Sequence, residues 1–316
     1  MQKFIRLSGI VLIFAMQISY LSAKTGGASE SETRRGFVQQ TILNNAIEQT
    51  LKEYEPRGLK PEEIAATLID LRAPKNVASY RGSEKLYPAS VVKMFYMVYL
   101  HRLLQDGKIK MTPELNRGLT DMIVVSSNDA TQYILDVITG TTSGPELSAS
   151  ELEKWGYQRN VVNRYFSSLG YKDINVNQKT YCEDAYGREQ QFRGKNGVNR
   201  NMLTTVATAK LLYSIVTGNA VTKERSAEMM KLMRRDWENQ KPDAEHIEFV
   251  SYALSPGTKL WSKEGWTSVA RHDAAYIETA DGQKLVLVVF TEHHTSEQQI
   301  IPSVARKVIK ALGEIG

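Results

Sequence analysis

A single lysine interrupts an apolar segment that we expect to form a buried helix. Between Leu86 and Leu100, Lys93 is the only charged residue, and the positions around it are almost all apolar. A helix that is apolar on nearly every side is expected to be buried. An ammonium group in such surroundings costs free energy unless it gains a partner or loses its proton. We therefore expect Lys93 to be buried and its pKa to be lowered.

A serine hydroxyl is available one turn before this lysine. Ser90 and Lys93 lie on one face of the expected helix, with Ser90 in its first turn. A lysine of low pKa can take the proton of a serine hydroxyl, and the helix N-terminus stabilises the negative charge that develops. The same two residues also fit an N-cap serine followed by a lysine that reaches to solvent. The pair alone leaves both interpretations open.

Two further polar segments follow along the chain. The first, Ser126-Ser127-Asn128-Asp129, lies between two expected helices and by itself is typical of a helix cap. The second, Lys263-Glu264-Gly265, follows a β-like run that ends at Trp261 and by itself indicates little. The order of the three segments is what carries information.

In this order, Ser-x-x-Lys opening a buried helix, Ser-x-Asn between helices and Lys-x-Gly on a late strand resemble the active-site serine penicillin-recognising enzymes, specifically the class A β-lactamases. The resemblance covers about residues 35–313 and includes the Thr-rich segment 203–212. It implies a serine hydrolase, with a small-molecule β-lactam or peptidoglycan-like substrate and no cofactor. The implied fold is α+β, with a mainly antiparallel sheet flanked by helices and an inserted all-α lobe.

The resemblance also assigns roles by position. Ser90 would be the acylated nucleophile, Lys93 would exchange its proton, and Ser126 would relay a proton to the leaving nitrogen. Backbone N–H groups of Ser90 and Trp266 would form an oxyanion hole, in which one donor is worth about 3–4 kcal/mol. The implied substrate-binding residues are Asn128, Lys263, Gly265 and Trp266.

The residue that would hydrolyse the acyl-enzyme is harder to place. Class A enzymes use the Glu of a Glu-x-x-Leu-Asn motif, which this sequence lacks. Counting back from Thr204-Thr205, Glu189 stands at about the right distance, but Phe192 and Arg193 replace the Leu and Asn. We expect Glu189 to be the base, with Glu183 as the rival and a solvated loop carboxylate as the alternative interpretation.

A second departure lies in the Lys-x-Gly motif. Glu264 stands where the family usually has a Thr or Ser that binds the antibiotic's carboxylate. If its side chain points into the cleft, it repels that carboxylate; alternatively it pairs with Lys263 or faces away. Ser127 in place of Asp is a milder change, and the interval from Ser90 to Ser126 is shorter than usual. A peptidoglycan D,D-peptidase, which shares the acylation machinery but not the base, therefore remains an alternative.

The elements that must position these residues follow from hydrophobic periodicity. Helical spacing predicts an opening helix over 37–54, and β-like runs predict a hairpin over 65–80. Strands at both ends of the chain predict one sheet, built from 24–88 and 222–316, with a helical lobe over 89–221 and a ligand cleft between them. The remaining predicted elements are a helix over 223–237, β-like runs over 258–261, 274–278 and 284–291, and a closing helix over 301–312.

The first residues are typical of targeting rather than of a fold. Lys3 and Arg6 precede an apolar run from Leu7 to Met16, and a small-residue cleavage site ends at Ala23. We expect a signal peptide over 1–23 and a periplasmic or secreted catalytic domain over 24–316. No later run approaches about 18 apolar residues, so we expect no stable membrane insertion. We also expect a monomer.

Composition and charge narrow the remaining classes. The chain has 316 residues, 42% of them apolar, and a single cysteine, Cys182, which describes a globular protein without an internal disulfide. There are 40 basic and 35 acidic residues; without Lys3 and Arg6 the excess falls from +5 to +3, too small to indicate a nucleic-acid partner. Arg234-Arg235, beside Asp236, is interpreted as a solvated helix face.

Three other functions are disfavoured. A Ser-His-Asp hydrolase would need His272 and Asp273, but these are neighbours on an expected strand and point to opposite faces. The same objection applies to His293-His294 as a metal pair, and five His with one Cys show no ligand-spaced cluster, so no metal is expected. A sensor that acylates only once has no visible signalling segment to support it.

Overall fold

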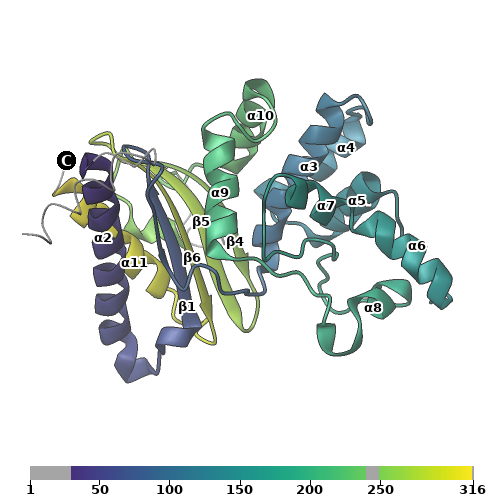
Figure 1. Cartoon of the computed structure of the whole chain (residues 1–316), viewed down its shortest axis with the longest axis horizontal. Coiled ribbons are helices and arrows are strands. Elements are labelled where there is room, and N and C mark those ends of the chain that lie inside the picture. The colour runs from purple at the N-terminus through teal and green to yellow at the C-terminus, as the bar shows by residue number, and fades with distance from the viewer. Residues whose placement is uncertain (1–29, 240–248, 315–316) are drawn as a thin grey trace, which may run out of the picture.

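The computed structural model describes residues 30–239 and 249–314, so the expected signal peptide lies outside the described residues. Figure 1 shows a sheet with helices α2 and α11 at one end of the molecule and a group of helices, α3 to α8, at the other. Within the described ranges, no helix is long and apolar enough to cross a membrane.

The sheet has six antiparallel strands in the order β2-β1-β6-β5-β4-β3. The predicted hairpin is confirmed as β1 paired with β2, and β6 lies beside β1, which joins the two ends of the chain in one sheet. Helices cover both faces, and β5 and β6 therefore consist almost entirely of buried residues. The strands are β1 Ile64–Asp70, β2 Val77–Tyr80, β3 Arg234–Arg235, β4 Lys259–Trp266, β5 Ala270–Glu278 and β6 Lys284–Glu292.

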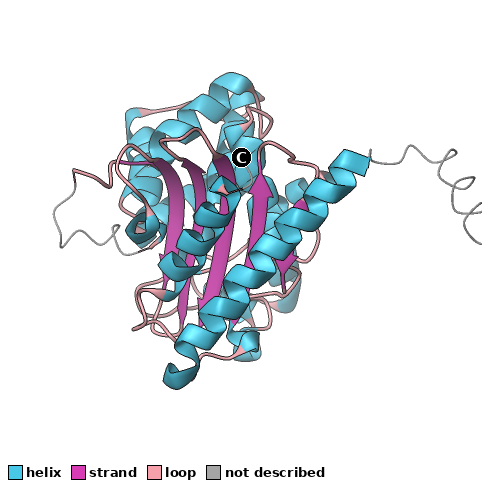
Figure 2. Cartoon of the chain, turned by 90° about the vertical axis from the view of Figure 1, so that its left-hand side faces the viewer, coloured by secondary structure: helices cyan, strands magenta, loops and turns pink. Residues whose placement is uncertain are grey.

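Two helices far apart in the sequence cover one face of this sheet. The opening helix α2 (Glu30–Tyr54) packs against the closing helix α11 (Ile300–Gly313), and both bury apolar side chains against the sheet. Figure 2, seen from this side, shows helices lying across the strands. The sequence predicted both helices, and α2 begins seven residues before the predicted start, at Glu30 instead of Phe37.

The other face of the sheet packs against α9 (Thr205–Val216), which continues into a core shared with the helical group. The predicted domain boundary at 221/222 places α9 in the helical lobe, although it packs against β1, β5 and β6. At the centre of the group, α3 is buried over most of its length. The remaining helices are α3 Lys93–Gln105, α4 Pro113–Val124, α5 Asn128–Thr139, α6 Ala149–Arg159, α7 Val161–Ser168, α8 Arg188–Arg193 and α10 Lys223–Met233.

Short 3-10 turns and caps set the ends of these elements. Thr112 Oγ1 accepts a hydrogen bond from the Leu115 N–H and begins α4, and Gly140, with φ of 65°, ends α5 in the left-handed region. Between α7 and α8 the chain runs without a helix, where the sequence predicted an α-rich segment. The 3-10 turns are Glu55–Arg57, Pro61–Glu63, Ala89–Val92, Lys195–Gly197 and Val250–Ala253.

The sequence-based prediction placed Arg234-Arg235 in the wrong element. The helix predicted over 223–237 ends at Met233, and Arg234-Arg235 forms the edge strand β3. The interpretation as a solvated helix face is wrong for Arg235, which is only 5% exposed. Its guanidinium turns inward because it donates hydrogen bonds to the carbonyls of Ile123 and Ser262.

Candidate active site

Ser90 lies in the 3-10 turn Ala89–Val92 that leads directly into α3. Strand β4 presses against this turn at Gly265, where a Cβ would lie 2.8 Å from Ser90 N. Tyr87, two residues before this turn begins, is anchored from β5, because His272 Nε2 lies 2.9 Å from the Tyr87 carbonyl. Burial lowers the pKa of His272 to about 4, and its Nδ1 accepts from the Thr291 N–H, so Nε2 is the protonated donor.

Lys93 is completely buried, as the sequence predicted. Its Nζ donates to the Ser126 carbonyl at 2.5 Å, to Asn128 Oδ1 at 3.0 Å and to Ser126 Oγ at 3.2 Å. Burial, followed by the nearby charge of Lys263, lowers the pKa of Lys93 to about 7. The sequence suggested Ser90, one turn earlier, as the partner of this amine. Among residues 30–239 and 249–314 no hydrogen bond joins the two, and the amine instead donates to Ser126 and Asn128.

Ser126 occupies the position between two lysine amines. Its Oγ lies 3.2 Å from Lys93 Nζ and 2.9 Å from Lys263 Nζ. The residue has φ of 57°, a left-handed conformation that is uncommon for residues other than glycine. The capping chemistry expected of the segment is performed by Ser127, whose Oγ accepts from the Ala130 N–H at the start of α5.

Lys263 reaches the site from β4 and is also completely buried. Its Nζ contacts Ser126 Oγ, the Glu264 carbonyl at 3.0 Å and Glu264 Oε1 at 2.8 Å. The second oxygen of Glu264 accepts from Arg235 Nη2 at 3.2 Å. The sequence left open whether the Glu264 side chain points into the cleft, pairs with Lys263 or faces away. In the structure it pairs with Lys263. Burial lowers the pKa of Lys263, and the Glu264 charge opposes that effect.

The structure brings the residues of the three motifs into one cluster and leaves Trp266 at its edge. Trp266 ends β4 directly after Gly265, and its side chain is 58% exposed. The clustered residues are Ser90, Lys93, Ser126, Asn128, Lys263 and Gly265.

Glu189 makes its contacts with residues outside this cluster. Its carboxylate accepts two hydrogen bonds from Arg159, at 2.7 and 2.8 Å, and one from Ser143 at 3.0 Å, and Lys179 lies 3.4 Å away. Burial raises the pKa of Glu189, but Arg159 and Lys179 outweigh it and hold the pKa below its usual range. In the described part of the chain, none of these contacts involves Ser90 or Lys93. The contacts argue against the expected role as a base, since its lone pairs are engaged by cations.

Sequence reasoning missed a residue at the site, Cys182. Asn128 Nδ2 donates to Cys182 Sγ at 3.7 Å, and the thiol is exposed and unbridged. From the sequence, this cysteine was assessed only as a possible member of a disulfide. No local pattern could have placed it here, because it lies in the helix-free stretch between α7 and α8.

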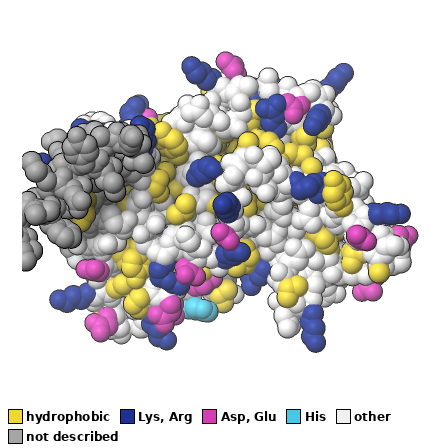
Figure 3. Space-filling view, in the orientation of Figure 1, with side chains coloured by type: hydrophobic (Ala, Val, Ile, Leu, Met, Phe, Trp, Pro, Cys, Tyr) yellow, Lys and Arg dark blue, Asp and Glu magenta, His cyan; other side chains and the backbone are white. Residues whose placement is uncertain are grey.

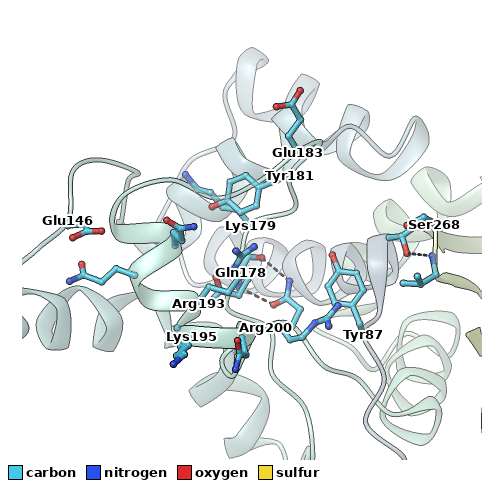
Figure 4. A pocket seen from close by; sticks show the side chains of 18 residues that line it. Tyr87, Glu146, Gln178, Lys179, Tyr181, Glu183, Arg193, Lys195, Arg200 and Ser268 are labelled. Carbon is cyan, nitrogen blue, oxygen red and sulfur yellow. Dashed lines mark hydrogen bonds between the residues drawn. The ribbon is translucent and has the colours of Figure 1, made fainter. Parts of the chain in front are cut away.

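A cavity of about 740 Å³ is lined by chain neighbours of the clustered residues but by none of the six clustered residues themselves. Its walls come from the stretch 178–201, from Tyr87 just before the Ser90 turn, and from Thr267 just after Trp266. Figure 4 shows Arg200 next to Tyr87, and it shows Glu183, the rival for the base, at the top of the view. The Arg200 guanidinium lies 4.2 Å from the Tyr87 ring centre. The lining is largely polar, and the Tyr87 ring forms part of its wall.

Other candidate sites gain no support from the geometry. His272 contacts Tyr87 and Thr291, whereas Asp273 Oδ2 accepts from the Val250 N–H, so the two do not form a dyad. His294 pairs with Glu63, and the described residues contain no group of three potential ligands able to hold a metal. On the face seen in Figure 3, basic and acidic side chains are interspersed.

Comparisons with known proteins agree with this arrangement. Residues 43–312 match the model of a family described as "Beta-lactamase enzyme family". A β-lactamase from Sphaerobacter thermophilus has a similar structure, with a TM-score of 0.62 and 18% identity over 86% of this chain and 98% of that one. A class A β-lactamase from Bacteroides cellulosilyticus gives a TM-score of 0.61 and 15% identity, over 87% and 99%.

A mutant of PBP-A, solved as an acyl-enzyme complex with penicillin G, is similar to the same degree. Its TM-score is 0.62, with 16% identity over 86% of this chain and 97% of that one. At such identities the likeness shows the fold. None of the curated proteins matches.

Proposed function

The chain belongs to the beta-lactamase enzyme family, and on that premise we propose that it is a serine hydrolase that opens a β-lactam ring through an acyl intermediate on Ser90. The coarser conclusion, a serine enzyme of the β-lactamase or penicillin-binding type, follows from the family and the fold. Our proposal adds the nucleophile, the reaction and the substrate class.

The observation that carries the proposal is the environment of Lys93. Its amine is fully buried, its pKa lies at about 7, and it is one turn from Ser90. A substantial fraction of this amine is therefore neutral near pH 7 and able to accept a proton. Its present hydrogen bonds go to Ser126 and Asn128, and catalytic hydrogen bonds often shorten only when substrate is bound.

In the proposed acylation, each proton that one group gives up is taken by another group of the cluster or by the substrate. Ser90 Oγ attacks the carbonyl carbon and gives its proton to Lys93, and the tetrahedral oxygen accepts from backbone N–H groups of Ser90 and Trp266. The carbon–nitrogen bond then breaks, and the leaving nitrogen takes the hydroxyl proton of Ser126. Lys93 or Lys263, both within hydrogen-bond distance of Ser126 Oγ, returns a proton to it.

A second candidate is a penicillin-binding or D,D-peptidase-like enzyme without efficient deacylation. The contacts of Glu189 favour it, because a carboxylate saturated by Arg159, Lys179 and Ser143 is a poor base for water. The two candidates share the acylation step and differ in the lifetime of the Ser90 adduct.

Location and biological role are part of the proposal. The expected signal peptide favours a periplasmic or secreted protein acting as a monomer on small molecules. Removal of a β-lactam there would confer antibiotic resistance.

Purified protein mixed with nitrocefin and with penicillin G, with intact-mass detection, tests the function. Rapid colour development supports the hydrolase, and a long-lived adduct that disappears in Ser90→Ala supports the penicillin-binding candidate. An adduct on another residue, or no reaction at all, would overturn both.

A further inference from the structure

We propose that the Glu264 carboxylate, which is paired with Lys263, selects against substrates that would place an anion next to the Lys263 amine. The site then takes amides that carry an uncharged group at that position. The inference rests on the proposed acylation of Ser90 and names the substrate class for that reaction. It also assigns a role in specificity to Glu264.

The hydrogen-bonding capacity of Lys263 is already used. An ammonium group has three N–H donors, and three acceptors lie within 3.0 Å of Lys263 Nζ: Ser126 Oγ, the Glu264 carbonyl and Glu264 Oε1. A substrate carboxylate would have to displace one of these acceptors. Displacing Ser126 would disturb the hydroxyl proposed to protonate the leaving nitrogen.

The charge of Lys263 is also matched within the protein. Glu264 is 4% exposed and Lys263 is 0% exposed, so solvent screens the pair poorly. The other Glu264 oxygen contacts Arg235 Nη2, which also donates to the carbonyls of Ile123 and Ser262. Arg235 is thus tied to the protein and is buried as well.

A second carboxyl group, that of Asp273, lies on the strand next to Glu264. Asp273 on β5 is the direct cross-strand partner of Glu264 on β4 and is 1% exposed. A substrate anion arriving at Lys263 would meet the Glu264 charge at close range, and like charges that cannot separate cost affinity. An ester, amide or hydroxyl at the same place leaves the network intact.

The direct test compares one ligand in two charge states on the unmodified protein. Penicillin G and its methyl ester differ only in the carboxylate, and the rate of Ser90 acylation by each is followed by intact mass. We expect the ester to acylate faster, by about tenfold or more, which corresponds to about 1.4 kcal/mol. Equal rates, or a faster reaction of the free acid, would overturn the inference.

Substitution of Glu264 tests whether that residue is responsible. In Glu264→Thr, and in Glu264→Gln, which keeps the size of the side chain, the acid-to-ester rate ratio should rise by about tenfold. Glu153→Gln removes one negative charge from an exposed position on α6 and should leave the ratio unchanged. If the ratio stays at the wild-type value in both Glu264 variants while they remain folded, the assignment is wrong.

A binding experiment separates this inference from the proposed reaction. In a Ser90→Ala background no acylation takes place, and calorimetry measures affinity alone. We expect the ester to bind more tightly than penicillin G, and Glu264→Thr to remove that preference. Weaker or equal binding of the ester would contradict the inference, whatever the reaction at Ser90. Absence of acylation in the Ser90 protein with either ligand would instead contradict the proposed function.

Discussion

The backbone of Gly265 lies against the backbone of Ser90 with no room for a side chain: a Cβ on Gly265 would come within 2.8 Å of Ser90 N and of the Pro88 carbonyl oxygen. Because both are backbone atoms, neither can rotate away. The glycine of the Lys-x-Gly motif therefore allows β4 to press against the turn that carries Ser90, the proposed nucleophile. This contact joins the sheet to the helical group.

The first prediction concerns this contact. Gly265→Ala should push β4 away from the turn, lower stability by about 1–3 kcal/mol and slow acylation of Ser90. Urea unfolding and intact-mass kinetics with a β-lactam measure the two effects. A variant of normal stability that acylates at the normal rate would show that the close approach is not required.

The second prediction follows from the pKa of Lys93. With a pKa of about 7, the neutral fraction of the amine rises about tenfold between pH 6 and pH 8, and the acylation rate should rise with it. Lys93→Met should slow acylation by about 10²–10⁴-fold and remove this dependence. Single-turnover rates across this pH range test it. A flat profile in the wild-type protein would mean that Lys93 is not the base.

The third prediction concerns stability and pH at Asp273. Burial raises its pKa to about 7, so between its usual value near 3.8 and about pH 7 the folded protein keeps a proton that the unfolded chain loses. Its contribution to stability is therefore greatest in acid and declines as pH rises through that window, by a few kcal/mol. Asp273→Asn should be more stable than wild type at pH 8, with a smaller difference at pH 5. Urea unfolding at both values measures it, and a constant difference would contradict the raised pKa.

The fourth prediction separates a structural role of Glu189 from a catalytic one. Glu189→Gln and Arg159→Met each break the buried ion pair and should cost roughly 3–5 kcal/mol. If Glu189 only holds the loop, both variants should show the same change in adduct lifetime. Accumulation of the Ser90 adduct in Glu189→Gln alone would instead establish the glutamate as the base.

The sequence predicted those features that depend on local periodicity and failed where long side chains reach across the fold. The buried position of Lys93 followed from the apolar residues around it, and the hairpin and terminal helices followed from simple spacing. Arg235 was misplaced because a two-residue strand leaves no pattern. The pairing of Glu264 stayed open because alternation along a strand does not tell where a flexible carboxylate ends.

The last prediction uses Cys182, which periodicity could not place because it lies in a helix-free stretch. Its exposed thiol contacts Asn128, whose other side-chain atom accepts from Lys93. A carboxamidomethyl group on Cys182 should crowd Asn128 and slow acylation of Ser90, whereas Cys182→Ser, which offers no thiol, should keep its rate after treatment with iodoacetamide. Intact mass verifies the modification and follows acylation. Because iodoacetamide can also react elsewhere on the surface, the serine variant shows whether the effect comes from this position. If the fully modified protein acylates Ser90 at an unchanged rate, the thiol lies outside the path of the substrate.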